Sequence, residues 1–427
     1  MRVVFLTAGA AGMYCGSCMH DNSLARAMRA AGDDVLLQPI YTPIRTDEVD
    51  VAGNDVFFGG IQVYALQRFP WLTKVPRWAR SWMDSPRLLR WVTAKASGTD
   101  PSELGALTVS MLRGEHGRQS TEVDRLVEWL EKEIRPDAII FSNILIAGAI
   151  PTIRSRLPAT RLIVLLQGDD VFLDHLPPTF QTQSIELCSE IATQVHRFVC
   201  HSEFYRAKMG DMFSIDSARI DVHPLSIDLP PASPRPPRDD RSPFRIGYFA
   251  RIAPEKGLHL LADAFIDLAG REGADSVELH VAGWLGDHRR EYLKMIKSKI
   301  DLAGLGDRFT YHGSPERDEK FILLQSCEVR SVTAPYQDPK GLFILESLAV
   351  GTPVIQPDHG AFGELLRSTG GGWLAPPGDT AALADAIERV YRDGALRSSA
   401  MRGVRETLAQ RHSIETAAVA MRHACLS

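Results

Sequence analysis

GYFARIAPEKGLHLLADAF, residues 247–265, joins an apolar run to a segment whose leucines and alanines recur at helical spacing. We predict a strand at Phe244–Phe249 and a helix at Leu258–Ala269, with Arg251 and Lys256 in the loop between them. Ligands of open α/β sheets bind beyond the carboxyl ends of strands. Two cations in such a loop are suited to a diphosphate, because they would stabilise its negative charge. For these two residues alone, a solvated loop with incidental charges is the alternative.

A second stretch, YQDPKGLFILESLAVGTPVI at residues 336–355, predicts a helix that begins at about Gly341. The amides of Lys340, Gly341 and Leu342 would then bind an anion at the helix start, and Gly341 would let the backbone approach a phosphate closely. Glu346 lies about 7.5 Å further along the axis, and Asp338 precedes the helix. Two carboxylates on either side of an anion site match the ribose, diphosphate and sugar of a nucleotide sugar.

Strand and helix patterns alternate along most of the chain, which predicts parallel sheets covered on both faces. Among them we predict helices at Thr121–Ile134 and Ile144–Arg156 and strands at Val277–Ala282 and Val329–Val332. At 427 residues the chain is too long for one ordinary core. The stretch LPPASPRPPRDDRSP, with six prolines in fifteen residues, predicts an extended linker. We therefore predict an α/β fold of two Rossmann-like domains that face each other across a cleft. The parts are an N-terminal acceptor-side domain at 1–228, the linker at 229–243, a nucleotide-sugar-binding domain at 244–405, and a helix at 406–427 that crosses back.

Composition excludes several classes of protein. A net charge of −5 argues against a general nucleic-acid binder, which needs a basic excess. Six cysteines in this length do not form a disulfide framework. The amino terminus MRVVFLTAGAAG lacks the layout of a secretory signal, and the longest apolar stretch, Ala138–Ile153, is too short to span a bilayer. We expect a cytoplasmic protein.

The two stretches after residue 244 resemble the carboxy-terminal domain of the family 4 retaining glycosyltransferases, the GT-B type of the glycosyl transferases group 1. The resemblance implies that Arg251 and Lys256 hold the donor diphosphate and that Glu346 binds the ribose hydroxyls. Asp338 stands where the family has a glutamate that binds the donor sugar, with the same seven intervening residues before Glu346. The blocks HGSPERDEKFILLQSCEV and GTPVIQPDHGAFGELL also match in order, with Glu364 in the place of a late family glutamate.

The chain departs from the family pattern in three places. Asp338 is one methylene shorter than the usual glutamate, and Lys340 replaces an aromatic residue at the phosphate site. In the first domain, the block LLQGDDVFL places Gln167 where the family often has a histidine near the donor sugar. Glutamine cannot take a proton, so its role there would be hydrogen bonding. For Asp169 and Asp170 of the same block, a solvated loop or a hydrogen bond to sugar is favoured over a metal site.

The resemblance implies a retaining glycosyltransferase. The acceptor hydroxyl would attack from the front face, the leaving phosphate would take its proton, and Arg251 and Lys256 would stabilise the charge. Neither a metal nor a cofactor is expected, since the nucleotide-diphosphate sugar is a co-substrate. The alternatives are a nucleotide-sugar epimerase, a sugar phosphorylase, which Glu346 as a ribose ligand argues against, and a nucleotide-sugar-binding protein without transferase activity, which Gln167 favours.

The loop after the first strand contains Cys15-x2-Cys18, followed by His20 and Asp21. Zinc requires four ligands, and no second pair follows at suitable spacing. We favour a loop of small residues, Gly12 among them, that allows close approach of donor or acceptor, as the resemblance implies.

The segment Tyr64–Val92 holds four of the seven tryptophans, Trp71, Trp78, Trp82 and Trp91, and six Lys/Arg against one Asp. Such a segment can lie in a membrane interface. It can equally bury its tryptophans in the first domain or hold a carbohydrate or lipid-linked acceptor, with the arginines extending to solvent in each case. Peripheral membrane contact and ordinary packing stay open as alternatives.

Overall fold

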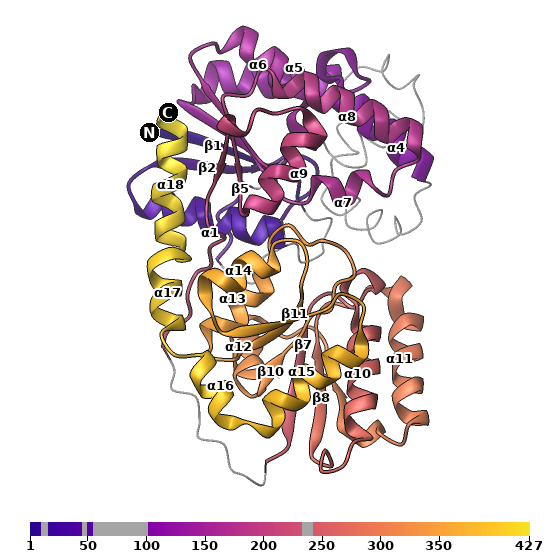
Figure 1. Ribbon diagram of the computed structural model, residues 1–427. Helices are drawn as coiled ribbons and strands as arrows, with labels where there is room; N and C mark the ends of the chain where they lie inside the picture. Colours follow the sequence, from indigo (N-terminus) through magenta and orange to yellow (C-terminus); the bar gives the residue numbers. More distant parts are fainter. Residues whose placement is uncertain (10–15, 45–48, 54–100, 233–241) are drawn as a thin grey trace. The chain divides into compact units, whose positions relative to one another are not determined.

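The computed structural model describes residues 1–9, 16–44, 49–53, 101–232 and 242–427. Contacts divide the chain into two units, Met1–Pro224 with Ile414–Ser427, and Leu225–Ser413 (Figure 1). Each unit is a parallel sheet with helices, so the predicted α/β class and its two Rossmann-like domains are confirmed. Residues 225–228 and 406–413, predicted to belong to the first domain and to the crossing helix, lie in the second unit. Residues 233–241 of the predicted linker are outside the described ranges.

The sheet of the first unit has the strand order β2-β1-β3-β4-β5-β6, and every neighbouring pair is parallel. The order reverses between β1 and β3. The strands are β1 (Arg2–Thr7), β2 (Asp34–Pro39), β3 (Ala138–Phe141), β4 (Arg161–Leu165), β5 (Arg197–Cys200) and β6 (Ile220–Val222).

Both faces of this first sheet are buried. In β1, Val4 and Leu6 enter one apolar cluster, whereas Val3 and Phe5 enter another on the opposite face. Side chains alternate along a strand, so a doubly covered strand requires the continuous apolar run that the sequence has. The helices are α1 (Gly16–Ala30), α4 (Pro101–Leu112), α5 (Ser120–Trp129), α6 (Ile150–Arg156), α7 (Asp169–Leu173), α8 (Pro178–Ala192), α9 (Glu203–Phe213) and α18 (Ile414–Leu426).

Two predicted helices of the first unit are interrupted. The helix predicted over 121–134 ends as α5 at Trp129 and continues as a π turn, Leu130–Ile134. The helix predicted over 144–156 begins as a 3-10 segment, Ile144–Ala149, and only α6 is α-helical. Pro151 is in the first turn of α6, where its missing N–H and fixed φ suit a new helix start.

The sheet of the second unit has the order β12-β11-β10-β7-β8-β9, again with parallel neighbours throughout. Its order reverses between β7 and β10. The strands are β7 (Phe244–Phe249), β8 (Val277–Ala282), β9 (Phe309–Tyr311), β10 (Val329–Arg330), β11 (Val354–Pro357) and β12 (Gly372–Ala375). Strand β10 is shorter than the predicted 329–332 because the side chain of Gln356 accepts the hydrogen bond from the Val332 amide, at 3.3 Å.

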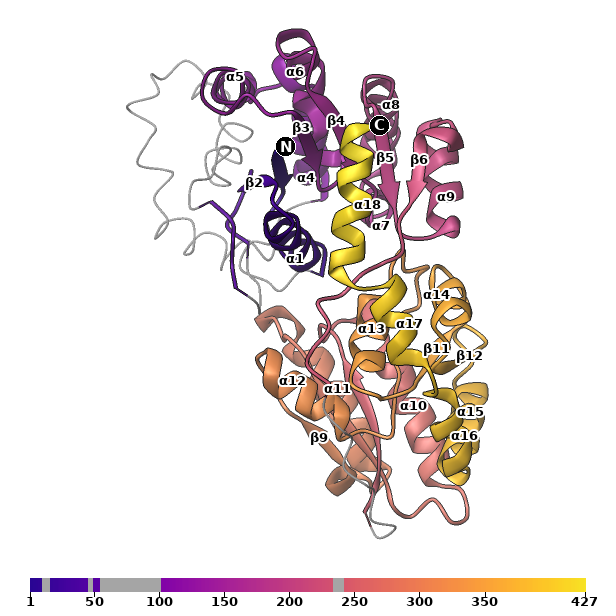
Figure 2. The same ribbon diagram turned by 90° about the vertical axis from the view of Figure 1, so that its left-hand side faces the viewer.

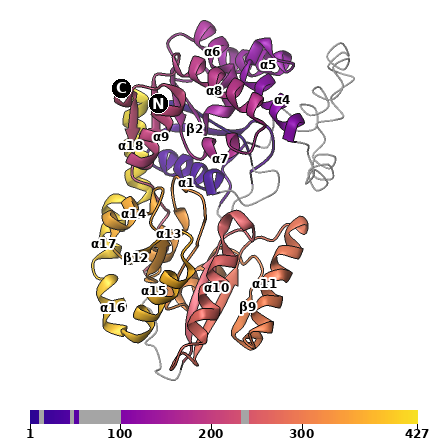
Figure 3. The ribbon, with the colours of Figure 1, turned by 45° about the vertical axis from the view of Figure 1, so that its right-hand side comes forward.

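Helices pack on both faces of the second sheet. On one face α10 and α15 lie side by side, with α11 next to α10 (Figure 3). On the other face Leu225 and Ile227 join the apolar cluster of α13, α14 and α17, which explains why these residues belong to the second unit. The helices are α10 (Leu258–Ala269), α11 (Arg290–Leu302), α12 (Arg317–Gln325), α13 (Leu342–Ala349), α14 (Phe362–Thr369), α15 (Thr380–Arg392), α16 (Gly394–Ala400) and α17 (Val404–Arg411).

The carboxy-terminal region forms two helices rather than one. Helix α17 packs in the second unit, and α18 packs against α1 and β4 of the first (Figure 2). Between them, the ring Nδ1 of His412 lies 2.7 Å from the carbonyl oxygen of Leu225, and Ser413 forms a β-bridge with Ile227. These contacts end α17.

Candidate functional site

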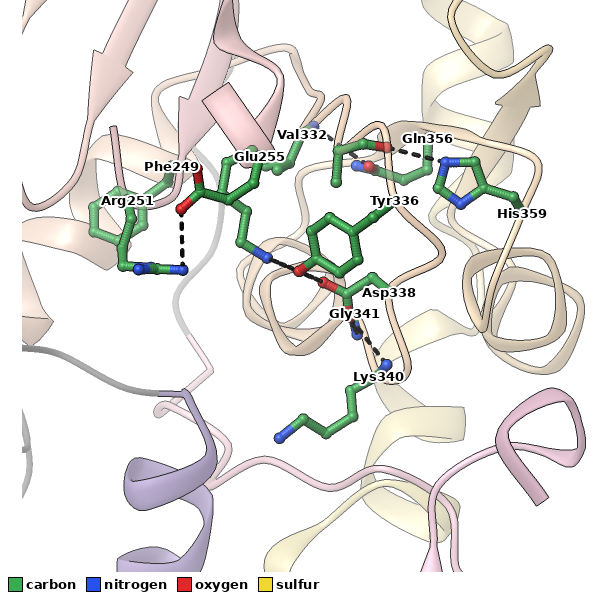
Figure 4. A network of polar contacts seen from close by, with 12 residues as sticks. Phe249, Arg251, Glu255, Val332, Tyr336, Asp338, Lys340, Gly341, Gln356 and His359 are labelled. Carbon is green, nitrogen blue, oxygen red and sulfur yellow. Dashed lines mark hydrogen bonds and ion pairs between the residues drawn. The ribbon is translucent and has the colours of Figure 1, made fainter. Parts of the chain in front are cut away.

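The candidate site lies in the second unit, where the strand order reverses between β7 and β10. Loops that leave neighbouring strands diverge at such a point and form the usual ligand crevice of open α/β sheets. The loop after β7 carries Arg251 and Lys256, and the loop after β10 carries Tyr336, Asp338 and the start of α13. The fold thus brings together the two stretches that the sequence singled out (Figure 4).

Side-chain hydrogen bonds hold the backbone of the loop after β7 in place. The hydroxyl of Tyr248 lies 3.1 Å from the carbonyl oxygen of Arg251 and 3.3 Å from that of Lys256. The Thr333 hydroxyl donates to the carbonyl of Gly257 at 2.6 Å. Gly257 has φ +72°, and a Cβ there would lie 1.8 Å from the carbonyl oxygen of Thr333. Only glycine allows this approach of the two loops.

Arg251 lies on the more exposed side of the loop. Its guanidinium is 3.6 Å from the carboxylate of Glu255, and the two side chains are 40% and 34% exposed. An exposed pair of this kind holds its partners weakly. The guanidinium can therefore exchange Glu255 for an anionic ligand at small cost.

Lys256, Tyr336 and Asp338 form a closed polar cluster. The Lys256 ammonium donates to Asp338 Oδ2 at 3.1 Å and to the Tyr336 hydroxyl, and the Tyr336 hydroxyl donates to Asp338 Oδ2 at 2.7 Å. The side chains of Lys256 and Asp338 are 15% and 9% exposed. Burial raises the pKa of Tyr336 and the Asp338 carboxylate raises it further, whereas Arg251 acts in the opposite sense. Tyr336 therefore keeps its hydroxyl proton and stays a hydrogen-bond donor. The opposing effect of Arg251 shows that its charge is close enough to act on the cluster.

Asp338 stays ionised because its partners outweigh its burial. Burial alone would raise its pKa, but the Lys256 charge, the Tyr336 hydroxyl and the Lys340 amide lower it to about 2. Its Oδ1 accepts hydrogen bonds from the Lys340 and Gly341 amides, each at 3.0 Å. The carboxylate has about four lone-pair positions, and four donors occupy them.

Helix α13 begins one residue later than predicted, at Leu342, with Gly341 as its N-cap at φ +79°. Two of the three amides predicted to bind an anion, those of Lys340 and Gly341, donate to Asp338 instead. An aspartate reaches the amides two and three residues ahead, as in an Asx turn. The Leu342 and Phe343 amides are in the first helical turn, where N–H groups have no intrahelical acceptor.

Glu346, the predicted ribose ligand, is on the buried face of α13. Its Oε1 accepts a hydrogen bond from Lys320 at 3.2 Å, and its Oε2 is 3.8 Å from the guanidinium of Arg330. Arg330 is fully buried, which lowers its pKa to about 10 although Glu346 raises it. Its guanidinium donates to the carbonyls of Phe249 and Phe343 and so connects β7 with α13. Neither Lys320 nor Arg330 was predicted from the sequence, although an arginine inside an apolar strand is a visible anomaly.

The segment after β11 packs against the Asp338 loop and hydrogen-bonds to its backbone. The Ala361 amide donates to the Asp338 carbonyl at 3.0 Å, and a Cβ on Gly360 would lie 2.6 Å from that oxygen. The His359 ring Nε2 lies 3.0 Å from the carbonyl of Ala334. Glu364 follows in the first turn of α14 and is half-buried.

In the first unit, Gln167 lies beyond the end of β4 and is buried. Its amide nitrogen donates to Asp21 Oδ1 at 3.1 Å and to the Ser142 carbonyl at 2.6 Å. The Thr7 hydroxyl donates to the other oxygen of Asp21 at 3.2 Å. Gln167 thus connects three strand ends with α1. Its role towards a donor stays a prediction, and Gly12 lies outside the described residues.

A solvated loop is wrong for Asp169 and Asp170, because both are buried. Asp169 accepts from the Ile144 and Gln167 amides, and Asp170 accepts from the Tyr205 hydroxyl and the Lys208 ammonium. Burial raises the pKa of Asp169 to about 6, although hydrogen bonds from three backbone amides, those of Gln167, Ile144 and Asp169, lower it. These carboxylates hold the LLQGDDVFL turn on the first sheet.

The remaining sequence hypotheses fall partly or wholly outside the described ranges. Cys15 is outside them, as are Trp71, Trp78, Trp82 and Trp91. Cys18 is buried in α1 and accepts a long hydrogen bond from the Thr7 hydroxyl, at 3.8 Å. Within the described ranges, no three His, Cys, Asp or Glu residues are grouped as metal ligands would be. No described helix has the length and apolarity to cross a membrane.

Comparison with known proteins finds similarities to the second unit. Residues 233–407 match the family model of the glycosyl transferases group 1. The phosphatidyl-myo-inositol mannosyltransferase of Mycobacterium leprae is 32% identical over 144 residues, which are 34% of this chain and 36% of that protein. The D-inositol 3-phosphate glycosyltransferase of an Arthrobacter strain is 28% identical over 208 residues, 47% of this chain and 48% of that one. The chain thus spans about half or less of the length of these relatives.

Solved structures share the fold of both units. Anabaena HepE in complex with UDP has a TM-score of 0.67 at 17% identity, with 99% of each chain covered. The sucrose-phosphate synthase of Thermosynechococcus elongatus has a TM-score of 0.68 at 17% identity, with 99% of this chain and 98% of that one covered. Identities this low establish the fold alone.

Proposed function

We propose that this chain, a member of the group 1 glycosyl transferases by its residues 233–407, transfers a sugar from a nucleotide-diphosphate sugar to an acceptor hydroxyl. The observation that carries the proposal is the convergence of Arg251, Lys256 and the start of α13 at the strand-order reversal of the second sheet. UDP is bound by one protein of the same fold, Anabaena HepE. This similarity supports a nucleoside diphosphate as the leaving group of the proposed transfer.

The diphosphate would bind to cations and helix amides together. An ammonium has three N–H donors, and within the described part of the chain Lys256 uses two of them, on Tyr336 and Asp338. The third would face the phosphate. Arg251 would exchange Glu255 for a second phosphate oxygen, and the Leu342 and Phe343 amides would add the positive end of the α13 dipole.

Asp338 would act through this binding site rather than on the sugar. Four donors already occupy its carboxylate, so a sugar hydroxyl would have to replace one of them. Under this proposal Asp338 would not have the sugar-binding role that the resemblance implied for this position. Glu346 keeps lone pairs for the ribose hydroxyls, because each of its oxygens has one cationic partner at 3.2 or 3.8 Å.

The transfer would proceed with retention. The acceptor hydroxyl attacks the anomeric carbon on the face from which the diphosphate leaves, and the leaving phosphate oxygen takes the hydroxyl proton. Arg251 and Lys256 stabilise the charge that develops on the diphosphate, so that the step needs no metal. Addition of EDTA should then leave turnover unchanged. Loss of turnover that added Mg²⁺ or Mn²⁺ restores would contradict this part of the proposal.

A lipid-linked acceptor is one candidate. The matched Mycobacterium leprae protein is named a phosphatidyl-myo-inositol mannosyltransferase, and the Tyr64–Val92 segment of this chain combines tryptophan with excess positive charge. A carbohydrate acceptor is the other. Transfer assays with a lipid and a free sugar in parallel decide between the two.

Donor binding tests the proposal first. Thermal unfolding with UDP, GDP and ADP should show a rise in Tm for at least one of them, because a ligand specific to the native state stabilises it. The matching nucleotide sugar should then turn over, and Arg251→Ala should reduce kcat/KM about 100-fold or more at unchanged Tm. Arg392→Ala is the matched control, since that arginine also pairs with a glutamate four residues away. Binding without turnover would support the silent nucleotide-sugar-binding alternative, and no binding at all would contradict both.

A further inference from the structure

The hydroxyl of Tyr336 connects the two charged groups of the site. It accepts a hydrogen bond from the Lys256 ammonium and donates one to Asp338 Oδ2 at 2.7 Å. The Lys256 nitrogen also lies 4.8 Å from the centre of the Tyr336 ring. Lysine has a flexible four-carbon stem, so these contacts fix where its ammonium lies.

The direction of the hydrogen bonds follows from chemistry. The ammonium can only donate and the carboxylate can only accept. A phenol between them must accept from Lys256 and donate to Asp338. Its single hydrogen is then committed, and the ammonium keeps one N–H that no described residue accepts.

We infer that Tyr336 is a positioning residue of the donor site, which fixes the direction in which Lys256 presents its remaining N–H to a diphosphate. The inference rests on the proposed function, in which Lys256 binds that diphosphate. Tyr336 need not touch the donor itself. Its hydroxyl acts through Lys256: it accepts one ammonium N–H, Asp338 accepts a second, and two of the three donors are thus kept on one side.

Tyr336→Phe tests the inference, because it keeps the ring beside Lys256 and removes only the hydroxyl. Binding of inorganic pyrophosphate and of UDP, GDP and ADP is measured by calorimetry. For the ligand that wild type binds, we expect affinity to fall about tenfold, the equivalent of one hydrogen bond to a charged group. Tyr391→Phe is the matched control. Its hydroxyl donates to the Gly273 carbonyl at 2.9 Å, in the turn before β8, and its loss should leave affinity unchanged.

A double-mutant cycle separates positioning from a general loss of structure. If Tyr336 acts through Lys256, the Lys256→Met and Lys256→Met/Tyr336→Phe variants should bind the ligand equally. The inference would be overturned if the losses of binding free energy in the two single variants added up in the double variant. Wild-type affinity in Tyr336→Phe alone would also overturn it. A wild-type protein that binds neither pyrophosphate nor any nucleoside diphosphate would overturn the proposed function as well. The two failures are therefore distinguishable.

Discussion

The ammonium of Lys256 and the carboxylate of Asp338 are 82 residues apart in the sequence and 3.1 Å apart in the structure. Each belongs to a loop that leaves one of the two strands at the reversal of the sheet order, β7 and β10. The pair is largely buried, with exposed fractions of 15% and 9%. It therefore contributes both to the candidate site and to the stability of the second unit.

Asp338→Ala should destabilise the protein. The variant leaves the Lys256 ammonium buried without its anion and removes an acceptor from two helix-start amides. We expect the free energy of unfolding in urea to fall by about 3 kcal/mol. Asp287→Ala removes one partner of an exposed pair with Arg290 and should unfold like wild type. Equal stability of the two variants would show that the Lys256–Asp338 pair contributes little.

Gly257→Ala should disturb the site more than its backbone angle explains. Gly257 and Gly304 have similar φ values, +72° and +74°, but only a Cβ on Gly257 meets an atom, the Thr333 carbonyl oxygen at 1.8 Å. Gly304→Ala should cost roughly 1 kcal/mol for the left-handed backbone. Gly257→Ala should cost about 2 kcal/mol or more and weaken nucleoside diphosphate binding, since Lys256 precedes it. Urea unfolding of both variants measures the difference.

The free energy of unfolding should decrease as the pH is lowered from about 6.5 to about 4, because of His196. Burial and then Arg154 lower the pKa of this histidine to about 4. Its ring Nδ1 accepts a hydrogen bond from the Leu162 amide, and its Nε2 lies against the Arg154 guanidinium. The unfolded chain takes up the proton near pH 6.5 and the folded chain only near pH 4. The stabilisation is therefore complete above pH 6.5 and lost as the pH falls.

Substitution of His196 checks this pH dependence. The difference in Tm between pH 7 and pH 5 should be smaller in His196→Gln than in wild type. His116, which is 83% exposed, provides the control, and His116→Gln should keep the wild-type difference. An unchanged pH dependence in His196→Gln would contradict the assignment.

Membrane association is tested through the tryptophan-rich segment. If Tyr64–Val92 lies at a membrane interface, the protein should sediment with anionic vesicles, because tryptophan and excess positive charge both favour that surface. Binding should decrease with added salt and should be lost in Trp78→Ala/Trp82→Ala. Neutral phosphatidylcholine vesicles serve as the control. Failure to sediment with anionic vesicles would favour burial of these tryptophans within the protein.

The sequence predicts the periodic parts of the fold well. Strands Phe244–Phe249 and Val277–Ala282 and helix Leu258–Ala269 have the predicted bounds, because a doubly buried strand and an amphipathic helix each leave a pattern in neighbouring residues. The two-residue strand β10 was predicted too long. Its end depends on the Gln356 side chain, 24 residues beyond Val332, and no local pattern contains that contact.

The candidate site shows the same limit. The chemistry of Arg251, Lys256, Asp338 and Glu346 was visible in the residue types, and so was their order along the chain. The partners that alter this chemistry come from elsewhere in the chain. Tyr336 accepts from Lys256, 80 residues away, and Lys320 reaches Glu346 across 26 residues. Which lone pairs remain for a ligand is decided by these tertiary contacts.

Helix α18 has a consequence for how the chain is made. Ile414, Ala418 and Met421 complete the same apolar cluster as Val3 and Phe5 of the first strand. The ribosome releases those residues only after the whole second unit has been synthesised, and domains commonly fold in the order of their synthesis. Here the unit that is started first must wait with part of one face of its sheet uncovered, while residues 225–413 can already fold as a continuous segment.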